Sequence, residues 1–270
     1  MMQREDRQFV DAFARGLAIL EALSREQRPL NNGELSRATG LPPSTVSRLT
    51  HTAMALGYLR FSQSKRAYEL TPKNLTLGYP VLAGMTLLDR ARPLLKQLSE
   101  ETGETVGLVI RDGLHVTFVE VVQGSELVAV RLATGGRLPI AVSAAGIAIL
   151  AAMPDRDRRI LATRVRAHLA KRGGNVETFN AKLVEATELG ICFIRDAWRR
   201  GIGGIAMGLE NNGEMAAITI PIATGSVSEM DMHGRLADAL RATIDLLRGT
   251  AGGAHSVQTG TPSEARRRSH

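Results

Sequence analysis

The sequence predicts an α+β chain of two domains, a small one of helices with a β-hairpin and a larger one that mixes antiparallel strands with helices. In residues 9–57 the apolar residues recur at helical spacing, and two short alternating runs follow them. From Glu104 onward the pattern alternates in runs joined by Asp112-Gly113 and Asn212-Gly213, which are typical hairpin turns. The 270 residues, 44% of them hydrophobic, are enough for two cores. The predicted parts are a first domain at 1–72, a linker helix at 73–85, a second domain at 86–249 and a disordered tail at 250–270.

The first domain begins with a helix over about 9–24, whose Phe13, Leu17 and Leu20 are spaced to pack on the next helices. A connection at 25–31 leads to Asn31 or Asn32 as the N-cap of a second helix. That helix ends at Gly40-Leu41-Pro42-Pro43, and a third follows from Ser44 to Gly57. A short helix, a turn with glycine and a second helix have the spacing of a helix-turn-helix.

The third helix has two different faces. One face is an apolar stripe, predicted to be buried, made of Val46, Leu49, Ala53 and Leu56. The other face carries small donors and one cation near the helix N-terminus: Ser44, Thr45, Ser47, Arg48, His51 and Thr52. Hydroxyls bind phosphates and bases, and arginine pairs with guanine in the major groove, so we expect these residues to bind DNA.

A basic hairpin follows the third helix. Runs at 58–61 and 67–70 alternate like strands, and Lys65 and Arg66 lie at the tip between them. We expect this wing to lie against a phosphate backbone or in a minor groove. From Ser44 to Lys73 the only acid is Glu69, against the cations Arg48, Arg60, Lys65, Arg66 and Lys73. The alternative is an ordinary helical hairpin with a solvated basic turn.

The rest of the chain divides into further elements. Pro72 suits a first helical position, Gly78 and Pro80 interrupt the linker helix, and Pro93 predicts a kink or break near Arg92 in an amphipathic helix at 86–101. Strands are predicted at 105–111, 114–122, 127–132, 191–196, 202–209 and 215–222. Helices are predicted at 143–152, 155–169, 176–189 and 226–248.

Composition restricts the possible functions. The net charge of +7 suits a polyanionic partner, although part of it lies at 266–268. No segment has the roughly 18 apolar residues of a membrane span, and the charged first residues do not resemble a secretory signal. One cysteine excludes an internal disulfide and fits a reducing compartment. We therefore expect a cytoplasmic protein associated with the nucleoid.

No catalytic, metal or cofactor site is predicted. The stretch from Gly201 to Ala206 satisfies the dinucleotide fingerprint, but it runs into a strand instead of opening a helix. The six histidines lack metal-ligand spacing. Cys192 lies in an apolar strand, where a buried structural thiol or a pocket-lining one would fit. The alternative function is a small-molecule sensor or enzyme whose N-terminal helices make only protein contacts.

Motifs in a fixed order over residues 9–248 carry a family resemblance. They include Arg15-Gly16-Leu17-Ala18-Ile19-Leu20, Thr39-Gly40-Leu41-Pro42, Ser44-Thr45, Arg48-Leu49, Leu56-Gly57-Tyr58, Tyr68-Glu69-Leu70-Thr71-Pro72, Thr102-Gly103-Glu104-Thr105 and Gly136-Arg137-Leu138-Pro139. The chain resembles the IclR family of bacterial transcription regulators. The resemblance implies a winged helix-turn-helix, a linker helix and a GAF-like effector-binding domain. It also implies a homodimer or homotetramer that binds double-stranded operator DNA and responds to small organic, often aromatic, acids from catabolic pathways.

Two features depart from the family pattern. Thr50 stands where the family usually has an apolar residue, and would loosen the helix or add a DNA contact. In the effector region the family's acidic cluster is here Ile194-Arg195-Asp196-Ala197-Trp198. Strand positions that supply a thiol or hydroxyls in some members are here Gly204, Thr219 and Pro221, which favours a different or more apolar ligand.

We expect the effector pocket to lie between the sheet and the small-residue helix from Ser143. Small side chains there would let N–H groups at the helix start approach a carboxylate. The predicted site is Arg137, Ser143, Ala144, Ala145, Ile194, Asp196, Trp198, Gly204 and Thr219, with apolar walls at Ile191, Phe193, Ile194, Ile205 and Met207. The alternatives are that the small residues serve only helix–sheet packing, and that Trp198 caps the domain instead of walling the pocket.

Overall fold

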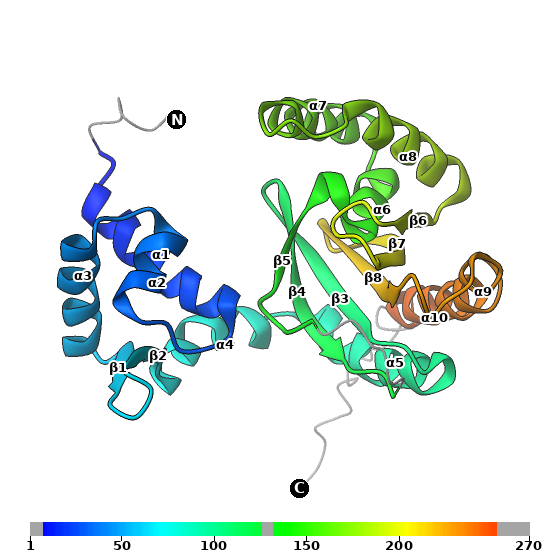
Figure 1. Ribbon diagram of the computed structural model, residues 1–270. Helices are drawn as coiled ribbons and strands as arrows, with labels where there is room; N and C mark the ends of the chain where they lie inside the picture. The colour runs from blue at the N-terminus through cyan, green and yellow to red at the C-terminus, as the bar shows by residue number, and fades with distance from the viewer. Residues whose placement is uncertain (1–7, 126–131, 253–270) are drawn as a thin grey trace, which may run out of the picture. The chain divides into compact units, whose positions relative to one another are not determined.

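A computed structural model of the chain describes residues 8–125 and 132–252, the last three by backbone alone. The chain forms two compact units, Met1–Met85 and Thr86–His270 (Figure 1). None of the described helices is long and apolar enough to cross a membrane. Each unit has its own hydrophobic core.

The first unit contains the predicted helix-turn-helix and wing. Its elements are α1 (Asp11–Glu26), α2 (Asn32–Thr39), α3 (Pro43–Ala55), β1 (Leu59–Ser62), β2 (Ala67–Leu70), η1 (Pro72–Asn74) and α4 (Leu75–Ala83). A capping box starts α2, because the Asn31 side chain accepts from the Glu34 N–H at 2.9 Å and Glu34 accepts from the Asn31 N–H at 2.8 Å. Gly40, with φ of +71°, ends α2 in the left-handed conformation that glycine favours.

The core of this unit differs from the predicted one at three positions. Its buried residues are Ile19, Ala22, Leu23, Leu30, Leu35, Val46 and Leu59. Phe13 and Leu17, predicted to pack on the helix pair, are 69% and 41% exposed, because α1 turns a second apolar stripe toward the core. Leu56 lies just after the last turn of α3 and is also exposed, so the apolar stripe of α3 ends at Ala53.

The second unit contains a six-stranded antiparallel sheet in the order β5-β4-β3-β8-β7-β6. The strands are β3 (Val106–Asp112), β4 (His115–Val122), β5 (Arg137–Pro139), β6 (Cys192–Arg195), β7 (Ile202–Asn211) and β8 (Glu214–Ala223). The predicted hairpins at Gly113 and Gly213 connect β3 to β4 and β7 to β8, with φ of +61° and +82° at the two glycines. The Gly201–Ala206 stretch runs into β7, so it opens no helix.

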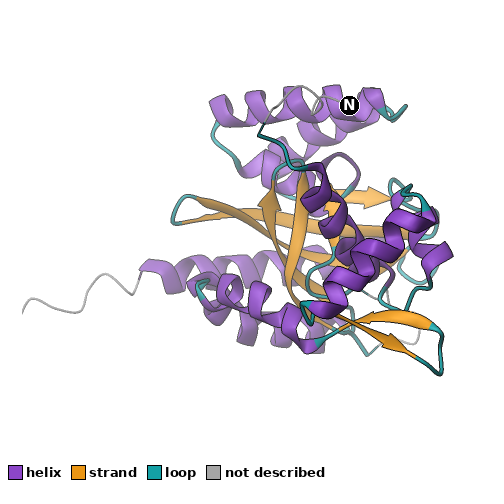
Figure 2. Cartoon of the chain, turned by 90° about the vertical axis from the view of Figure 1, so that its left-hand side faces the viewer, coloured by secondary structure: helices purple, strands orange, loops and turns teal. Residues whose placement is uncertain are grey.

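Helices cover both faces of this sheet (Figure 2). One face is covered by α5 (Thr86–Thr102) and α10 (Arg235–Gly252). The other is covered by α6 (Ala144–Ala152), which follows η2 (Ile140–Val142), with α7 (Asp155–Lys171) and α8 (Val176–Leu189) packed around it (Figure 1). The backbone of α6 lies so close to β7 that a Cβ on Gly208 would be 2.3 Å from the Ala148 carbonyl oxygen.

The second unit departs from the predicted elements in four places. The break expected near Arg92 is absent and α5 continues through Pro93, held by a buried face that includes Leu88, Ala91 and Leu95. The C-terminal helix is two helices, α9 (Glu229–His233) and α10, because Gly234 has a non-helical backbone (φ −98°, ψ −104°). Strand β5 was not predicted. The helix α10 reaches Gly252, while the strand predicted at 127–132, apart from its last residue, and the tail from 253 on lie outside the described residues.

Candidate functional site

The predicted DNA-binding residues of α3 lie on one solvent-facing surface. Ser44, Ser47, Arg48, His51 and Thr52 are exposed and Thr45 is half-buried. All of them except Ser44 line a groove together with the start of α1. Pro43 occupies the first helical position of α3, where its missing N–H costs no hydrogen bond. The fold of this unit thus presents the whole predicted face on one side of α3.

The side chains of this face differ in how they are held. Neither Arg48 nor His51 makes a side-chain hydrogen bond or ion pair to any residue that the structure describes. Ser47 is already engaged, because its Oγ accepts a hydrogen bond from Asn32 Nδ2 at the start of α2. The Thr52 hydroxyl donates to the Arg48 carbonyl oxygen at 3.1 Å. Arg48 is therefore the cation of this face that is free to bind an external acceptor.

Thr50 does not reach this surface. It is fully buried, and its hydroxyl donates to the carbonyl oxygens of Val46 and Ser47 at 3.0 and 3.1 Å. The possibility that Thr50 adds a DNA contact is therefore wrong. The hydroxyl fits the core because both of its acceptors belong to the preceding turn of the same helix.

The wing is an antiparallel hairpin in which Arg60 lies opposite Glu69. Lys65 Nζ lies 3.1 Å from Glu69 Oε1, so this predicted DNA-binding cation forms an ion pair. Arg66 is exposed at the tip with a φ of +48° and forms no ion pair within the described chain. After the hairpin, Lys73 Nζ donates to the Leu56 carbonyl oxygen at 2.8 Å and lies over the Tyr58 ring.

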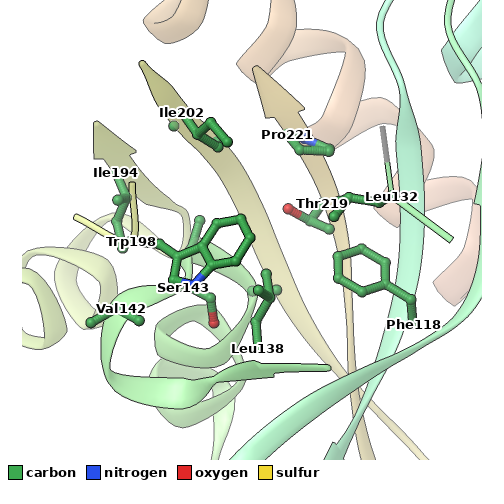
Figure 3. Close-up of a pocket in the computed structure, with 14 residues that line it drawn as sticks. Phe118, Leu132, Leu138, Val142, Ser143, Ile194, Trp198, Ile202, Thr219 and Pro221 are labelled. Atoms are coloured by element: carbon green, nitrogen blue, oxygen red, sulfur yellow. The ribbon is translucent and has the colours of Figure 1, made fainter. Parts of the chain in front are cut away.

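The second unit contains a small apolar pocket at the predicted position (Figure 3). Seven of the nine predicted effector residues line it: Ser143, Ala144, Ala145, Ile194, Trp198, Gly204 and Thr219. Its volume is about 50 Å³. For comparison, an engineered apolar cavity that holds benzene has a volume of about 150 Å³. An aromatic ring would therefore enter only if part of the wall moved.

The polar groups of the pocket are preorganised by the protein. Ser143 is the N-cap of α6: its Oγ accepts from the Gly146 N–H at 3.1 Å and donates to the Pro139 carbonyl oxygen at 3.0 Å. The Thr219 hydroxyl donates to the Ile205 carbonyl oxygen at 2.9 Å. Helix geometry leaves the N–H groups of the first turn without intrahelical partners, and Ala144 and Ala145 carry such groups at the pocket. An anionic group in the pocket would find backbone N–H donors there and no cationic side chain among the described residues that line it.

Comparisons with known proteins identify the chain. The family model of the IclR C-terminal domain of bacterial transcriptional regulators matches residues 80–247, and that of the IclR helix-turn-helix domain matches residues 12–63. This chain belongs to the IclR family. It is a DNA-binding transcription regulator with an effector-binding domain.

Individual relatives agree with this assignment. The Pca regulon regulatory protein of Pseudomonas putida is 29% identical over 242 residues, which cover 88% of this chain and 82% of that protein. A solved IclR family transcriptional regulator from Brucella abortus is 30% identical with a TM-score of 0.70, covering 93% of this chain and 95% of that one. An IclR homologue from Microbacterium hydrocarbonoxydans, solved with 4-hydroxybenzoate, has the same fold at 20% identity, with a TM-score of 0.65 over 90% and 99% of the two chains. The Pseudomonas and Brucella proteins are named as regulators, which favours regulation over an enzymatic function.

Two predicted effector residues of this IclR-family chain lie outside the pocket lining. Arg137 is exposed and its guanidinium binds Asp112 at 2.6 Å, across the β3–β4 end of the sheet. Asp196 shapes a turn: with φ of +57° it accepts from the Gly201 N–H and, at 3.3 Å, from the Thr224 hydroxyl. That turn places Trp198 in the pocket wall, with the Arg199 guanidinium 4.5 Å from the centre of its ring. Trp198 is thus a wall residue in this structure.

Most of the predicted apolar walls face away from the pocket. Ile194 lines it, whereas Phe193 and Ile205 pair with each other on the opposite face of the sheet, where Phe193 stacks on His233. Ile191 and Met207 do not line it either. Pro221, which the family comparison placed in the effector region, also lines the pocket, and the walls that were not predicted are Phe118, Leu132, Leu138, Val142, Ile202 and Gly203. The alternation of side chains along a strand would have assigned Ile194 and Phe193 to opposite faces of the sheet. Nothing in the sequence shows that residues of β4 and β5 form the other wall of the pocket.

Cys192 and the described histidines lie outside the pocket lining. Cys192 is buried, it does not line the pocket, and burial raises the pKa of its thiol to about 12. His115 is half-buried on β4, where burial and then the nearby Arg137 lower its pKa. Within residues 8–125 and 132–252, no group of three or more His, Cys, Asp or Glu side chains is arranged to hold a metal ion.

Proposed function

We propose that this IclR-family regulator reads a specific operator of a catabolic operon in the bacterial cytoplasm through α3 and the wing. The observation that supports this most directly is the solvent-facing side of α3, where Arg48 is exposed and forms no interaction with another described side chain. Its guanidinium can bind a base edge without first breaking a protein contact. Ser44, Thr45, His51 and Thr52 would add contacts to bases and phosphates.

Replacing Arg48 tests this role. Arg48→Ala should weaken operator binding by about 1–3 kcal/mol and relax selectivity at one base position. The operator would first be selected from genomic fragments retained by the protein, then titrated by fluorescence anisotropy beside a random duplex of equal length. Arg37→Ala, which removes an exposed cation from the last turn of α2 and leaves α3 unchanged, is a matched control. Equal losses on operator and random DNA would remove the base-reading role of Arg48.

We also propose that the regulator binds DNA as a two-fold dimer or a pair of dimers. Two helices of the first unit expose large apolar side chains, Phe13 and Leu17 on α1 and Leu75, Leu77, Tyr79 and Val81 on α4. Such residues on one small unit favour burial against a second copy. A dimer would read half-sites about 34 Å apart or a multiple of that. Light scattering on the parent and on Tyr79→Glu is the test, and a parent that stays monomeric at micromolar concentration with and without DNA would contradict it.

For the effector we propose a small organic acid, with an aromatic ring as the first candidate. The pocket is apolar, and among the described residues that line it the first turn of α6 is the electropositive feature that favours a carboxylate. The bound ligand of the Microbacterium homologue makes 4-hydroxybenzoate the first acid to test. Because the pocket holds only about 50 Å³, binding must displace part of the wall, and Trp198 should report it. An acid with unequal affinity for the free and the DNA-bound protein would change operator affinity by the same factor.

A panel of aromatic and aliphatic acids, followed by Trp198 fluorescence and thermal unfolding, tests this pocket. Trp198 is the only tryptophan in the sequence, so the signal comes from the pocket wall. Ser143→Trp should fill the pocket and abolish binding of any acid that stabilises the parent. If the variant is stabilised as strongly as the parent, the acid binds elsewhere and this assignment is wrong.

A further inference from the structure

The wing carries its charges around one carboxylate. Glu69 Oε2 accepts from Arg60 Nε at 3.1 Å and from Nη2 at 2.8 Å, while Oε1 accepts from Lys65 Nζ at 3.1 Å. The Glu69 side chain is 15% exposed, whereas those of Arg60 and Lys65 are 66% and 60% exposed. The carboxylate therefore lies beneath two cations that face the solvent.

This arrangement keeps Glu69 charged. The hydrogen bonds from Arg60, and then from Lys65, lower the pKa of the carboxyl group, so it is ionised at neutral pH. Both of its oxygens are occupied by these donors. Of the three cations in the hairpin, only Arg66 is left without an ion pair in the described chain.

We propose that Glu69 is a positioning residue that holds Arg60 and Lys65 away from DNA phosphates and so limits the sequence-independent affinity of the regulator. This inference rests on the proposed DNA-binding role of the wing. Glu69 occupies two of the five N–H donors of Arg60 and one of the three of Lys65, and its negative charge offsets theirs, so a phosphate competes with it for both cations. The carboxylate also places a negative charge beside the DNA. Sequence-independent binding comes from cations that neutralise phosphates, and Glu69 lowers the number that are available.

The test is the salt dependence of binding to a random-sequence duplex. Glu69→Gln keeps the side-chain shape but removes the charge that holds both cations. It should bind the random duplex several-fold more tightly at low salt. The slope of log affinity against log salt should become steeper by about one to two units, since each phosphate contact contributes about 0.9. If Glu69 served only the stability of the hairpin, Glu69→Gln would lower the unfolding temperature and leave this slope unchanged.

A matched control and a second substitution separate Glu69 from a general charge effect. Glu120→Gln on β4 removes an equal charge from a similar pair, in which Arg92 Nε lies 2.8 Å from Glu120 Oε2, and should leave the slope as in the parent. Lys65→Ala should flatten the slope little in the parent but by about one unit in the Glu69→Gln background. Such non-additivity is expected only if the carboxylate and phosphate compete for Lys65.

The salt slopes of the parent and of Glu69→Gln distinguish a failure of this inference from a failure of the proposed DNA binding. If the parent binds duplex DNA with a measurable salt slope and Glu69→Gln has the same or a flatter slope, Glu69 does not restrain the wing and this inference is wrong. Weaker binding by the folded variant would also overturn it, because the carboxylate would then be placing the cations for the DNA. If the parent shows no salt-dependent affinity for DNA, the proposed operator binding itself fails.

Discussion

Gly146 lies in the first turn of α6, and the structure decides whether replacing it by alanine raises or lowers the stability of the protein. Alanine is the better helix former by up to about 1 kcal/mol, so propensity alone predicts that Gly146→Ala stabilises the protein. The structure predicts the opposite. A Cβ at this position would lie 2.4 Å from Ile140 Cα and 2.7 Å from both the Ile140 carbonyl oxygen and Ser143 Oγ. Ordinary contacts between such atoms are about 3.5–4.0 Å, so the overlap is roughly 1 Å.

The backbone of η2 cannot rotate away from this methyl group as a side chain could. Overpacking of this kind costs about 1–3 kcal/mol, and displacing Ser143 would also weaken the N-cap of α6 by about 1 kcal/mol. After the propensity gain is subtracted, Gly146→Ala should lower the free energy of unfolding of the second unit by about 1–3 kcal/mol. Urea unfolding followed by the fluorescence of Trp198 reports on this unit alone, because Trp198 is the only tryptophan and lies within it.

Gly249→Ala in α10 is the matched control, since a Cβ there would meet no atom within 4 Å. It should be neutral or stabilise by up to about 1 kcal/mol. An unfolding midpoint for Gly146→Ala equal to or above that of the parent would refute the steric reasoning. It would mean that η2 can move away from α6 at little cost.

Three further predictions follow from individual side chains. For a random DNA duplex, Arg66→Ala should flatten the slope of log affinity against log salt by about one unit, and Lys65→Ala should flatten it by less. The difference is expected because Glu69 holds Lys65 and does not hold Arg66. Equal changes of the two slopes in an anisotropy titration would contradict this. Thr50→Val should leave operator affinity unchanged and alter the free energy of unfolding by less than about 1 kcal/mol. The reason is that the Thr50 hydroxyl bonds only to carbonyl oxygens of its own helix. A selective loss of operator binding would show that Thr50 contacts DNA. Because the pKa of the Cys192 thiol is about 12, only about one molecule in 10⁴ should carry a thiolate at pH 8. A thiol reagent should therefore label Cys192 only after unfolding. Fast labelling of the native protein would disprove its burial.

The local elements of the first unit were predictable because short-range chemistry determines them. The Asn31–Glu34 capping box, Gly40 and Pro43 set the limits of α2 and α3 within a few residues. The orientation of α1 was less predictable. It carries two apolar stripes, and only tertiary packing decides that Ile19 and Leu23 are buried while Phe13 and Leu17 are exposed.

The position of the pocket was predicted, but only part of its lining was, because tertiary packing brings the other residues of the lining together. The N-capped small-residue helix and Trp198 are recognisable in the sequence, and both line the pocket. Arg137 is adjacent in sequence to pocket residues, but β5 directs its guanidinium to Asp112 instead. Phe118 belongs to a strand 25 residues before Ser143, so only the sheet order brings the two together.

The two edges of the large sheet have a consequence for how the protein behaves at high concentration. The edge strands β5 and β6 are three and four residues long; β5 ends at Pro139, and β6 is followed by Asp196 with its positive φ. Along β5 and β6 themselves, an incoming strand would find only a short ladder of N–H and C=O groups, interrupted at once by a residue without an N–H or by a turn. Open-ended growth by adding strands from chain to chain at β5 or β6 is therefore disfavoured. Concentrated samples should stay free of fibrillar aggregates while the second unit is folded.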